Sequence, residues 1–166
     1  MLLSIVLIAI IIVMDRLVKY WAMAILAPAV ELPGIQGLFH FYYVENSGAA
    51  FSILSKHTWI LIVITCIVVL GALFLLFFTK TNLPVRLCLI GIIGGGIGNL
   101  IDRILYGYVI DMFKLDFMDF AVFNVADIFI TVAGIAMVAI LLFGKNNTIF
   151  ELKKGYDTKS NSTDSE

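Results

Sequence analysis

Amide and charged side chains end an otherwise apolar segment of this 166-residue chain. Asn99, Asp102 and Arg103 lie at positions i, i+3 and i+4, so a helix would carry all three on one face. Residues 87–98, which precede them, contain no charge and are expected to lie within a membrane. An acid at the centre of a membrane helix costs about 2.5–3.5 kcal/mol on insertion scales, which makes such an aspartate a candidate for function. A purely structural polar clamp between helices is the alternative.

Two further apolar segments carry acids. Asp15 and Lys19 are spaced i, i+4 and can neutralise each other, and Asp127 follows Asn124 near the start of the last apolar segment. At about 1.5 Å per residue, Asp15 and Asp102 lie about 20–22 Å from the inner ends of their helices, and Asp127 lies about 8 Å below the outer end of its own. In a hydrocarbon core about 30 Å thick, all three reach the outer leaflet. The sequence therefore predicts one site built from three helices.

Paired aspartates are the best candidates for chemistry in this site. Two carboxyl groups that share a site cannot both ionise easily, so one stays protonated. The ionised one can take a proton from water while the protonated one polarises a scissile carbonyl, which amounts to hydrolysis of a peptide bond by general acid–base catalysis. A serine–lysine dyad is disfavoured, because no serine lies at the depth of Lys19 in the inner spans.

The histidines and cysteines do not suggest a metal site. His40 and His57 are isolated, and Cys66 and Cys88 lie in apolar segments without the spacing of metal ligands. We therefore expect neither a metal nor a cofactor, and a zinc hydrolase is disfavoured.

The composition is that of a polytopic membrane protein. Hydrophobic residues make up 61% of the chain and charged residues 14%, with a mean hydropathy of +1.05. The net charge of −1 argues against a role in binding nucleic acid. The first apolar segment lacks a basic leader and a small-residue cleavage site, so it is expected to be a retained helix.

Apolar segments of helical length predict an all-α membrane protein with four transmembrane helices. The expected spans are residues 2–27, 59–78, 87–105 and 122–143. They form one membrane domain over residues 1–145, and the polar residues 146–166 are expected to be a disordered cytoplasmic tail.

Two external segments, residues 28–57 and 106–121, connect these spans on one side. Residues 38–44 are rich in aromatic and β-branched side chains and predict a strand, which the polar residues from Glu45 to Gly48 should end. Pro33-Gly34 predicts a turn, and Pro84 is expected in the loop of residues 80–86. Open sheet edges cannot cross lipid, so this small β-structure should lie at the interface or on top of the helices.

The distribution of basic residues predicts the orientation. Six Lys or Arg residues flank the side that holds both termini: Lys80, Arg86, Lys145, Lys153, Lys154 and Lys159. The opposite loops hold two, Lys56 and Lys114. The positive-inside rule therefore places both termini in the cytoplasm and the site in the outer leaflet.

Five motifs occur in order along residues 15–127: Asp15-x-x-x-Lys19; Asn46-x-Gly48-Ala49-Ala50-Phe51; Gly95-x-x-Gly98-Asn99-x-x-Asp102-Arg103; Val109-x-Asp111; and Phe123-Asn124-x-Ala126-Asp127. This set resembles the signatures of the bacterial lipoprotein signal peptidases, also called signal peptidase II. The resemblance implies a four-helix membrane aspartic protease of the bacterial cell (inner) membrane, with a small extracytoplasmic β-cradle. It also implies cleavage of prolipoproteins just before a cysteine modified with diacylglycerol.

The resemblance implies a role for each matching residue. Asp111 and Asp127 match the family's catalytic pair. The supporting and substrate-binding residues match Asp15, Lys19, Asn46, Gly48, Asn99, Asp102, Arg103 and Asn124. Prolipoproteins carrying diacylglycerol, membrane lipids and inhibitors of the globomycin type are the implied partners. One departure is Arg16, which stands where the family usually has Gln and adds a charge to the first span.

Three other functions fit parts of the pattern. An ion- or proton-conducting protein would also bury charges, but here the acids stop in the outer leaflet and the second span offers no polar path. A presenilin-like protease needs Gly-x-Gly-Asp, where this chain has Gly96-Ile97-Gly98-Asn99. A purely structural partner subunit is the third alternative.

Overall fold

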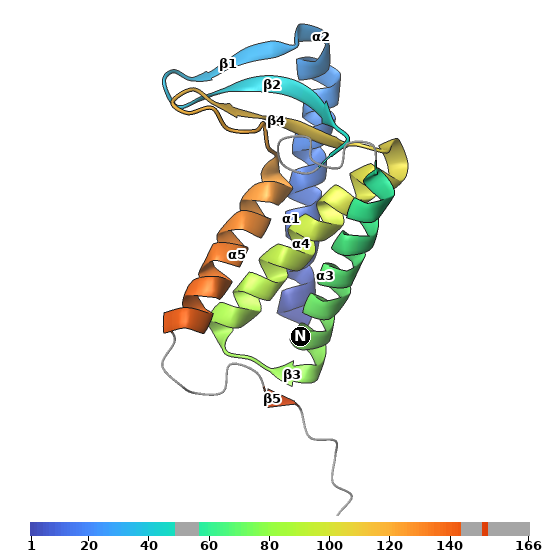
Figure 1. Ribbon diagram of the computed structural model, residues 1–166, viewed down its shortest axis with the longest axis vertical. Coiled ribbons are helices and arrows are strands. Elements are labelled where there is room, and N and C mark those ends of the chain that lie inside the picture. The colour runs from blue at the N-terminus through green and yellow to red at the C-terminus, as the bar shows by residue number, and fades with distance from the viewer. Residues whose placement is uncertain (49–56, 144–150, 153–166) are drawn as a thin grey trace, which may run out of the picture.

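The computed structural model describes residues 1–48, 57–143 and 151–152, and Figure 1 shows long helices side by side beneath a small sheet. Ala49, Ala50 and Phe51 of the second motif lie outside the described residues, as does nearly all of the tail expected over residues 146–166.

The helical elements are α1 (Leu2–Trp21), the π-helix η1 (Ala22–Leu26), α2 (Ala27–Ala29), α3 (Thr58–Phe78), α4 (Leu83–Tyr106) and α5 (Val125–Phe143). Among the described residues, three helices are long and apolar enough to cross a membrane: α3, α4 and α5. Helix α1 has 20 residues, but Asp15, Arg16 and Lys19 interrupt its apolar sequence. The protein is thus a mostly helical, membrane-integral protein with a small antiparallel sheet.

Helix α4 lies at the centre of the helices because it has glycines on three of its faces. A Cβ at Gly95 would lie 2.5 Å from the carbonyl oxygen of Ala126 in α5, and a Cβ at Gly94 would lie 2.8 Å from Ile11 in α1. A Cβ at Gly96 would meet a side chain of α3. These glycines therefore let three other helices come close to one backbone. The span of α4 is 61% buried, whereas that of α5 is 11% buried.

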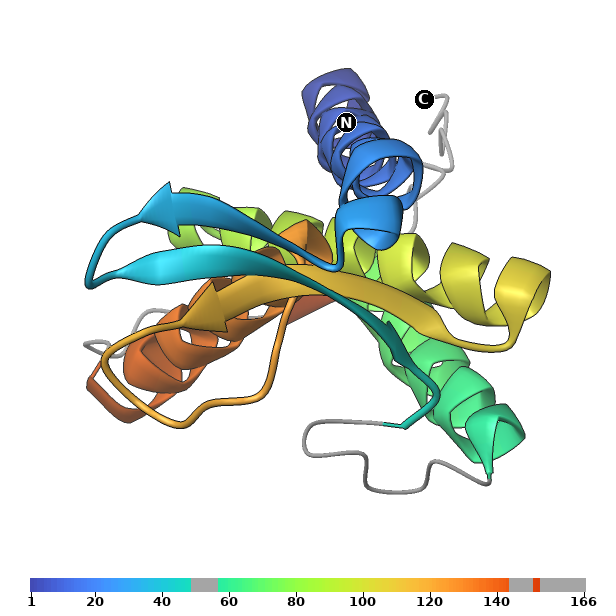
Figure 2. The ribbon, with the colours of Figure 1, turned by 90° about the horizontal axis from the view of Figure 1, so that it is seen from above.

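The three-stranded sheet lies across the end of the helices (Figure 2). Its antiparallel strands stand in the order β1 (Glu31–Ile35), β2 (Phe39–Asn46) and β4 (Val109–Leu115). Ile110 and Met112 of β4 pack against Ala22 and Leu26 of η1, so the sheet is attached to the end of the first helix. At the opposite end of the molecule, β3 (Thr79–Lys80) pairs with β5 (Glu151–Leu152) (Figure 1).

The sequence underestimated the amount of β-structure. The second external segment contains β4, because Val109 to Leu115 pair with β2 instead of forming a loop. Strand β2 continues two residues past Val44, because Asn46 pairs with Val109, and it ends within the polar segment as expected. Pro33 and Gly34 lie within β1 and do not form a turn. The edge position of β1 and its register shift between Leu32 and Ile35 accommodate a proline.

The helix ends also differ from the expectation. Pro84 lies in the first turn of α4, where a missing N–H costs nothing, and Asn82 caps this helix through its side-chain oxygen and the Val85 N–H at 3.1 Å. The last helix begins at Val125 and not at residue 122, so Asn124 precedes it. Helical backbone in the first span continues past Pro28.

Candidate active site

Asp111 lies on β4 and is almost completely buried. Its two oxygens accept hydrogen bonds from the side-chain amides of Asn46, at 2.9 Å, and Asn124, at 2.7 Å. Burial and the nearby Asp127 raise the pKa of Asp111 to about 7, against the lowering effect of the two amides and Lys19. A carboxyl group in this environment can hold a proton near neutral pH.

Asp127 is fixed by the start of α5. The Asp127 N–H donates to the side-chain oxygen of Asn124 at 2.9 Å, and the Asn124 N–H donates back to Asp127 Oδ2 at 3.2 Å. This reciprocal pair is a capping box, with aspartate at the third helical position. The other oxygen, Oδ1, accepts from the Asn99 amide at 2.7 Å. The helix start and a neutral amide therefore orient the carboxyl group.

The amides of Asn124 and Asn99 connect the two aspartates. Asn124 Nδ2 donates both to Asp111 and, at 3.1 Å, to Asn99 Oδ1. Asn99 Oδ1 also accepts from Lys19 Nζ at 2.9 Å. Because two donors occupy this oxygen, the NH₂ group of Asn99 must point to Asp127. The arrangement fixes which way each amide faces.

Behind these amides lies a cluster of four charged side chains. Lys19 Nζ lies 2.9 Å from Asp15 Oδ2 and 2.7 Å from Asp102 Oδ2. Arg16 contacts Asp102 Oδ1 and lies 3.5 Å from Asp15 Oδ2. Asp15 and Asp102 are completely buried, so each requires the cations beside it.

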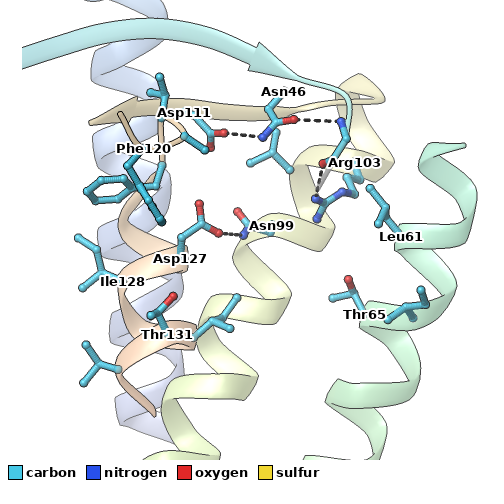
Figure 3. A pocket seen from close by; sticks show the side chains of 18 of the residues that line it. Asn46, Leu61, Thr65, Asn99, Arg103, Asp111, Phe120, Asp127, Ile128 and Thr131 are labelled. Carbon is cyan, nitrogen blue, oxygen red and sulfur yellow. Dashed lines mark hydrogen bonds between the residues drawn. The ribbon is translucent and has the colours of Figure 1, made fainter. Parts of the chain in front are cut away.

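Asp111 and Asp127 line one cavity of about 560 Å³ (Figure 3). At its polar end, Arg103 Nη2 donates to the Gly48 carbonyl at 3.2 Å, and the Gly48 N–H donates to Asn46 Oδ1 at 3.0 Å. The Nε atom of Arg103 is buried and has no hydrogen-bond partner within the described part of the chain. The cavity thus combines two carboxyl groups with an unused donor.

The remainder of the cavity is largely apolar. Its walls below the aspartates come from α3 and α5, with Leu61, Ile64 and Thr65 on one side and Ile128, Thr131 and Val132 on the other. Phe120 and Phe123 add aromatic surface from the segment between β4 and α5. The cavity can therefore accept a ligand with a polar reacting end and a long apolar portion.

The structure brings together all ten residues singled out in the sequence. Six line the cavity: Asn46, Gly48, Asn99, Arg103, Asp111 and Asp127. Four lie behind it: Asp15, Lys19, Asp102 and Asn124. The sequence did not predict the apolar wall of the cavity, because the residues of this wall are of the same types as the other residues of membrane helices. It also did not predict that Arg16 belongs to the buried charged cluster. The extra charge in the first span was the available signal. Across the described ranges, no group of three His, Cys, Asp or Glu residues could hold a metal.

Comparison with known proteins agrees with this geometry. The family model for signal peptidase (SPase) II matches residues 7–143. The lipoprotein signal peptidase of Streptococcus thermophilus (strain CNRZ 1066) is 43% identical over 135 residues, which cover 81% of this chain and 88% of that protein. That of Streptococcus pyogenes serotype M2 (strain MGAS10270) is 46% identical over 129 residues, covering 77% and 85%.

Two solved bacterial membrane enzymes have a similar fold. One, solved by the in meso method at 2.3 Å, has a TM-score of 0.75 and 28% identity, with 84% of this chain and 87% of that chain covered. The other, at 1.9 Å, has a TM-score of 0.76 and 26% identity, with 86% and 94% covered. With the family model matching most of the chain and the curated relatives sharing close to half of the aligned residues, this protein belongs to the signal peptidase II family of peptidases.

Proposed function

We propose that this protein is an aspartic endopeptidase that removes signal peptides from prolipoproteins, just before a cysteine modified with diacylglycerol. Asp111 and Asp127 form its catalytic dyad. The observation that carries this proposal is that both carboxyl groups line one cavity and both accept hydrogen bonds from Asn124, Asp111 from its side-chain amide and Asp127 from its backbone N–H. The names of the relatives support the substrate class.

In the proposed reaction the dyad shares one proton. The ionised aspartate takes a proton from a water molecule, which attacks the scissile carbonyl, while the protonated aspartate donates to the carbonyl oxygen. The raised pKa of Asp111 supports a shared proton near neutral pH. The amides of Asn46, Asn99 and Asn124 hold both carboxyl groups in place through hydrogen bonds of 2.7–2.9 Å and add no charge. No covalent intermediate and no metal take part.

Arg103 and Asn46 hold the substrate backbone in this proposal. A guanidinium group stays protonated in proteins, so Arg103 cannot act as a base. Its buried Nε atom has no hydrogen-bond partner among the residues that the structure describes, and it is suited to a substrate carbonyl. Asn46 is the last residue of β2 and donates to Asp111 on the neighbouring strand β4. An extended substrate peptide could lie alongside Asn46 at this point.

The apolar part of the cavity would receive the hydrocarbon portion of the substrate from the membrane. Its walls are helices α3 and α5, both candidate membrane spans. Helix α1 would be the fourth span, since Asp15 and Lys19 neutralise each other within the bundle. Globomycin-type inhibitors would place a hydroxyl group between the two carboxyl groups, in the position of the reacting water.

The topology follows from the distribution of basic residues, with both termini in the cytoplasm of a bacterium and the sheet outside the cell membrane. An impermeant thiol reagent should label a Gln36→Cys variant, in the turn between β1 and β2, on intact cells. It should label Lys80→Cys, at the opposite end, only after permeabilisation. Labelling in the reverse order would contradict this topology.

The substrate class is tested with the purified protein in nanodiscs and two synthetic peptides that differ only in the diacylglyceryl group on cysteine. We expect mass spectrometry to detect cleavage before cysteine in the modified peptide and none in its unmodified twin. EDTA and serine-directed reagents should leave the rate unchanged, because the dyad requires neither a metal nor a serine. Loss of activity in EDTA, restored by zinc, would overturn the aspartic mechanism.

A further inference from the structure

Arg16 is the second cation of the buried cluster, and Lys19 is the first. Lys19 contacts both Asp15 and Asp102, so it cannot neutralise both alone. Arg16 reaches the same two acids and brings the cluster to two positive and two negative charges. Burying an ion costs several kcal/mol even after relaxation, so an unbalanced carboxylate here would instead take up a proton or move.

The two acids of this cluster each hold one backbone amide. Asp15 Oδ1 accepts from the Ala126 N–H at 3.0 Å, and Asp102 Oδ2 accepts from the Ile110 N–H at 3.3 Å. Ala126 and Ile110 each directly precede one aspartate of the dyad. One anchor belongs to α5 and the other to β4, so the cluster sets the relative position of two elements that lie far apart in the sequence.

We propose that Arg16 is a positioning residue of the peptidase: its charge balances the buried carboxylates of Asp15 and Asp102, and the two carboxylates then hold the backbones that carry the dyad. This inference rests on the proposed function. Arg16 does not line the cavity and touches no reacting atom. Its removal should therefore impair the chemical step more than substrate binding.

The experiment compares the cleavage kinetics of the wild type with three variants in nanodiscs. Arg16→Gln should lower kcat about 10- to 100-fold with KM nearly unchanged, because a small displacement of catalytic groups has effects of this size. Arg16→Lys keeps the charge and should retain most of kcat. Arg86→Gln, at the far end of α4, is the matched control and should behave as the wild type.

A double-mutant cycle with Asp102→Asn separates charge balance from folding. The asparagine oxygen can still accept from the Ile110 N–H, and Lys19 alone then balances the one remaining acid, Asp15. Adding Arg16→Gln to Asp102→Asn should therefore cost little activity, although it is costly in the wild type. Size-exclusion chromatography and thermal unfolding in detergent check that each variant is folded.

Three results would overturn the proposal. The first is an Arg16→Gln enzyme as active as the wild type, and the second is an equal loss in both backgrounds of the cycle. The third is an Arg16→Lys enzyme as impaired as Arg16→Gln, since that would make the guanidinium shape decisive and not its charge. If the wild type itself does not cleave the diacylglyceryl peptide, the proposed function fails, and this inference fails with it.

Discussion

Four aspartates at the junction of sheet and helices differ in what surrounds them. Asp15 and Asp102 contact cations and accept hydrogen bonds from backbone N–H groups. Asp111 and Asp127 accept hydrogen bonds from neutral side-chain amides. Aspartate thus serves in two ways: two aspartates anchor backbone N–H groups, and two are suited to exchanging a proton.

The raised pKa of Asp111 should be visible in the pH dependence of stability. Its carboxyl group titrates at about 7 in the folded protein, against an ordinary value of 3.8. Between these pH values the folded state holds a proton that the unfolded state has lost, so stability falls as pH rises. Asn does not titrate, so Asp111→Asn should gain stability relative to the wild type by up to about 4 kcal/mol across this window.

Thermal unfolding in detergent between pH 4 and pH 8 measures this difference. The exposed loop residue Asp119 provides the control, and Asp119→Asn should keep a constant offset from the wild type. A stability difference between Asp111→Asn and the wild type that does not change with pH would show that Asp111 titrates as an ordinary carboxyl group.

At the scale of elements, close contact between α4 and α5 determines the site. Asn99 of α4 reaches Asp127 of α5 because Gly95 allows the two backbones to approach. Gly95→Ala would place a methyl group 2.5 Å from the Ala126 carbonyl oxygen and push α5 away. We expect a destabilisation of about 1–3 kcal/mol together with reduced cleavage.

Gly134→Ala is the matched control for this prediction. Gly134 lies on α5 itself, and a Cβ there meets nothing within 4 Å. This variant should keep its activity and melting temperature. Equal behaviour of Gly95→Ala and Gly134→Ala would show that helix contact at Gly95 does not limit the site.

The sequence predicted long helices where they occur, because long apolar segments are a local signal. It predicted the sheet poorly, since the first four residues of β4 are all buried and include Asp111 where an apolar side chain would be expected. The depth argument placed Asp15, Asp102 and Asp127 at one level, and the structure brings them together. The anchoring of Ala126 and Ile110 depends on tertiary contacts and was invisible in the sequence.

At the scale of the whole molecule, the site lies where a sheet meets the end of the helices (Figure 1). Asp111 comes from the sheet and Asp127 from a helix, and the cavity between them continues down along apolar walls. This geometry suits a substrate whose scissile bond lies at the membrane surface while the rest stays in lipid. Membership of a peptidase family disfavours ion conduction and a purely structural role.

The central claim is that Asp111 and Asp127 together carry out the cleavage, and the most direct test is the turnover of their asparagine variants. Purified Asp111→Asn, Asp127→Asn and Asp119→Asn enzymes are compared with the wild type on the diacylglyceryl peptide, with mass spectrometry of the products. We expect each dyad variant to be folded and to lose at least about 100-fold in rate, because each removes a group needed for proton transfer. The Asp119→Asn control should be fully active. Substantial turnover by either dyad variant would contradict the account.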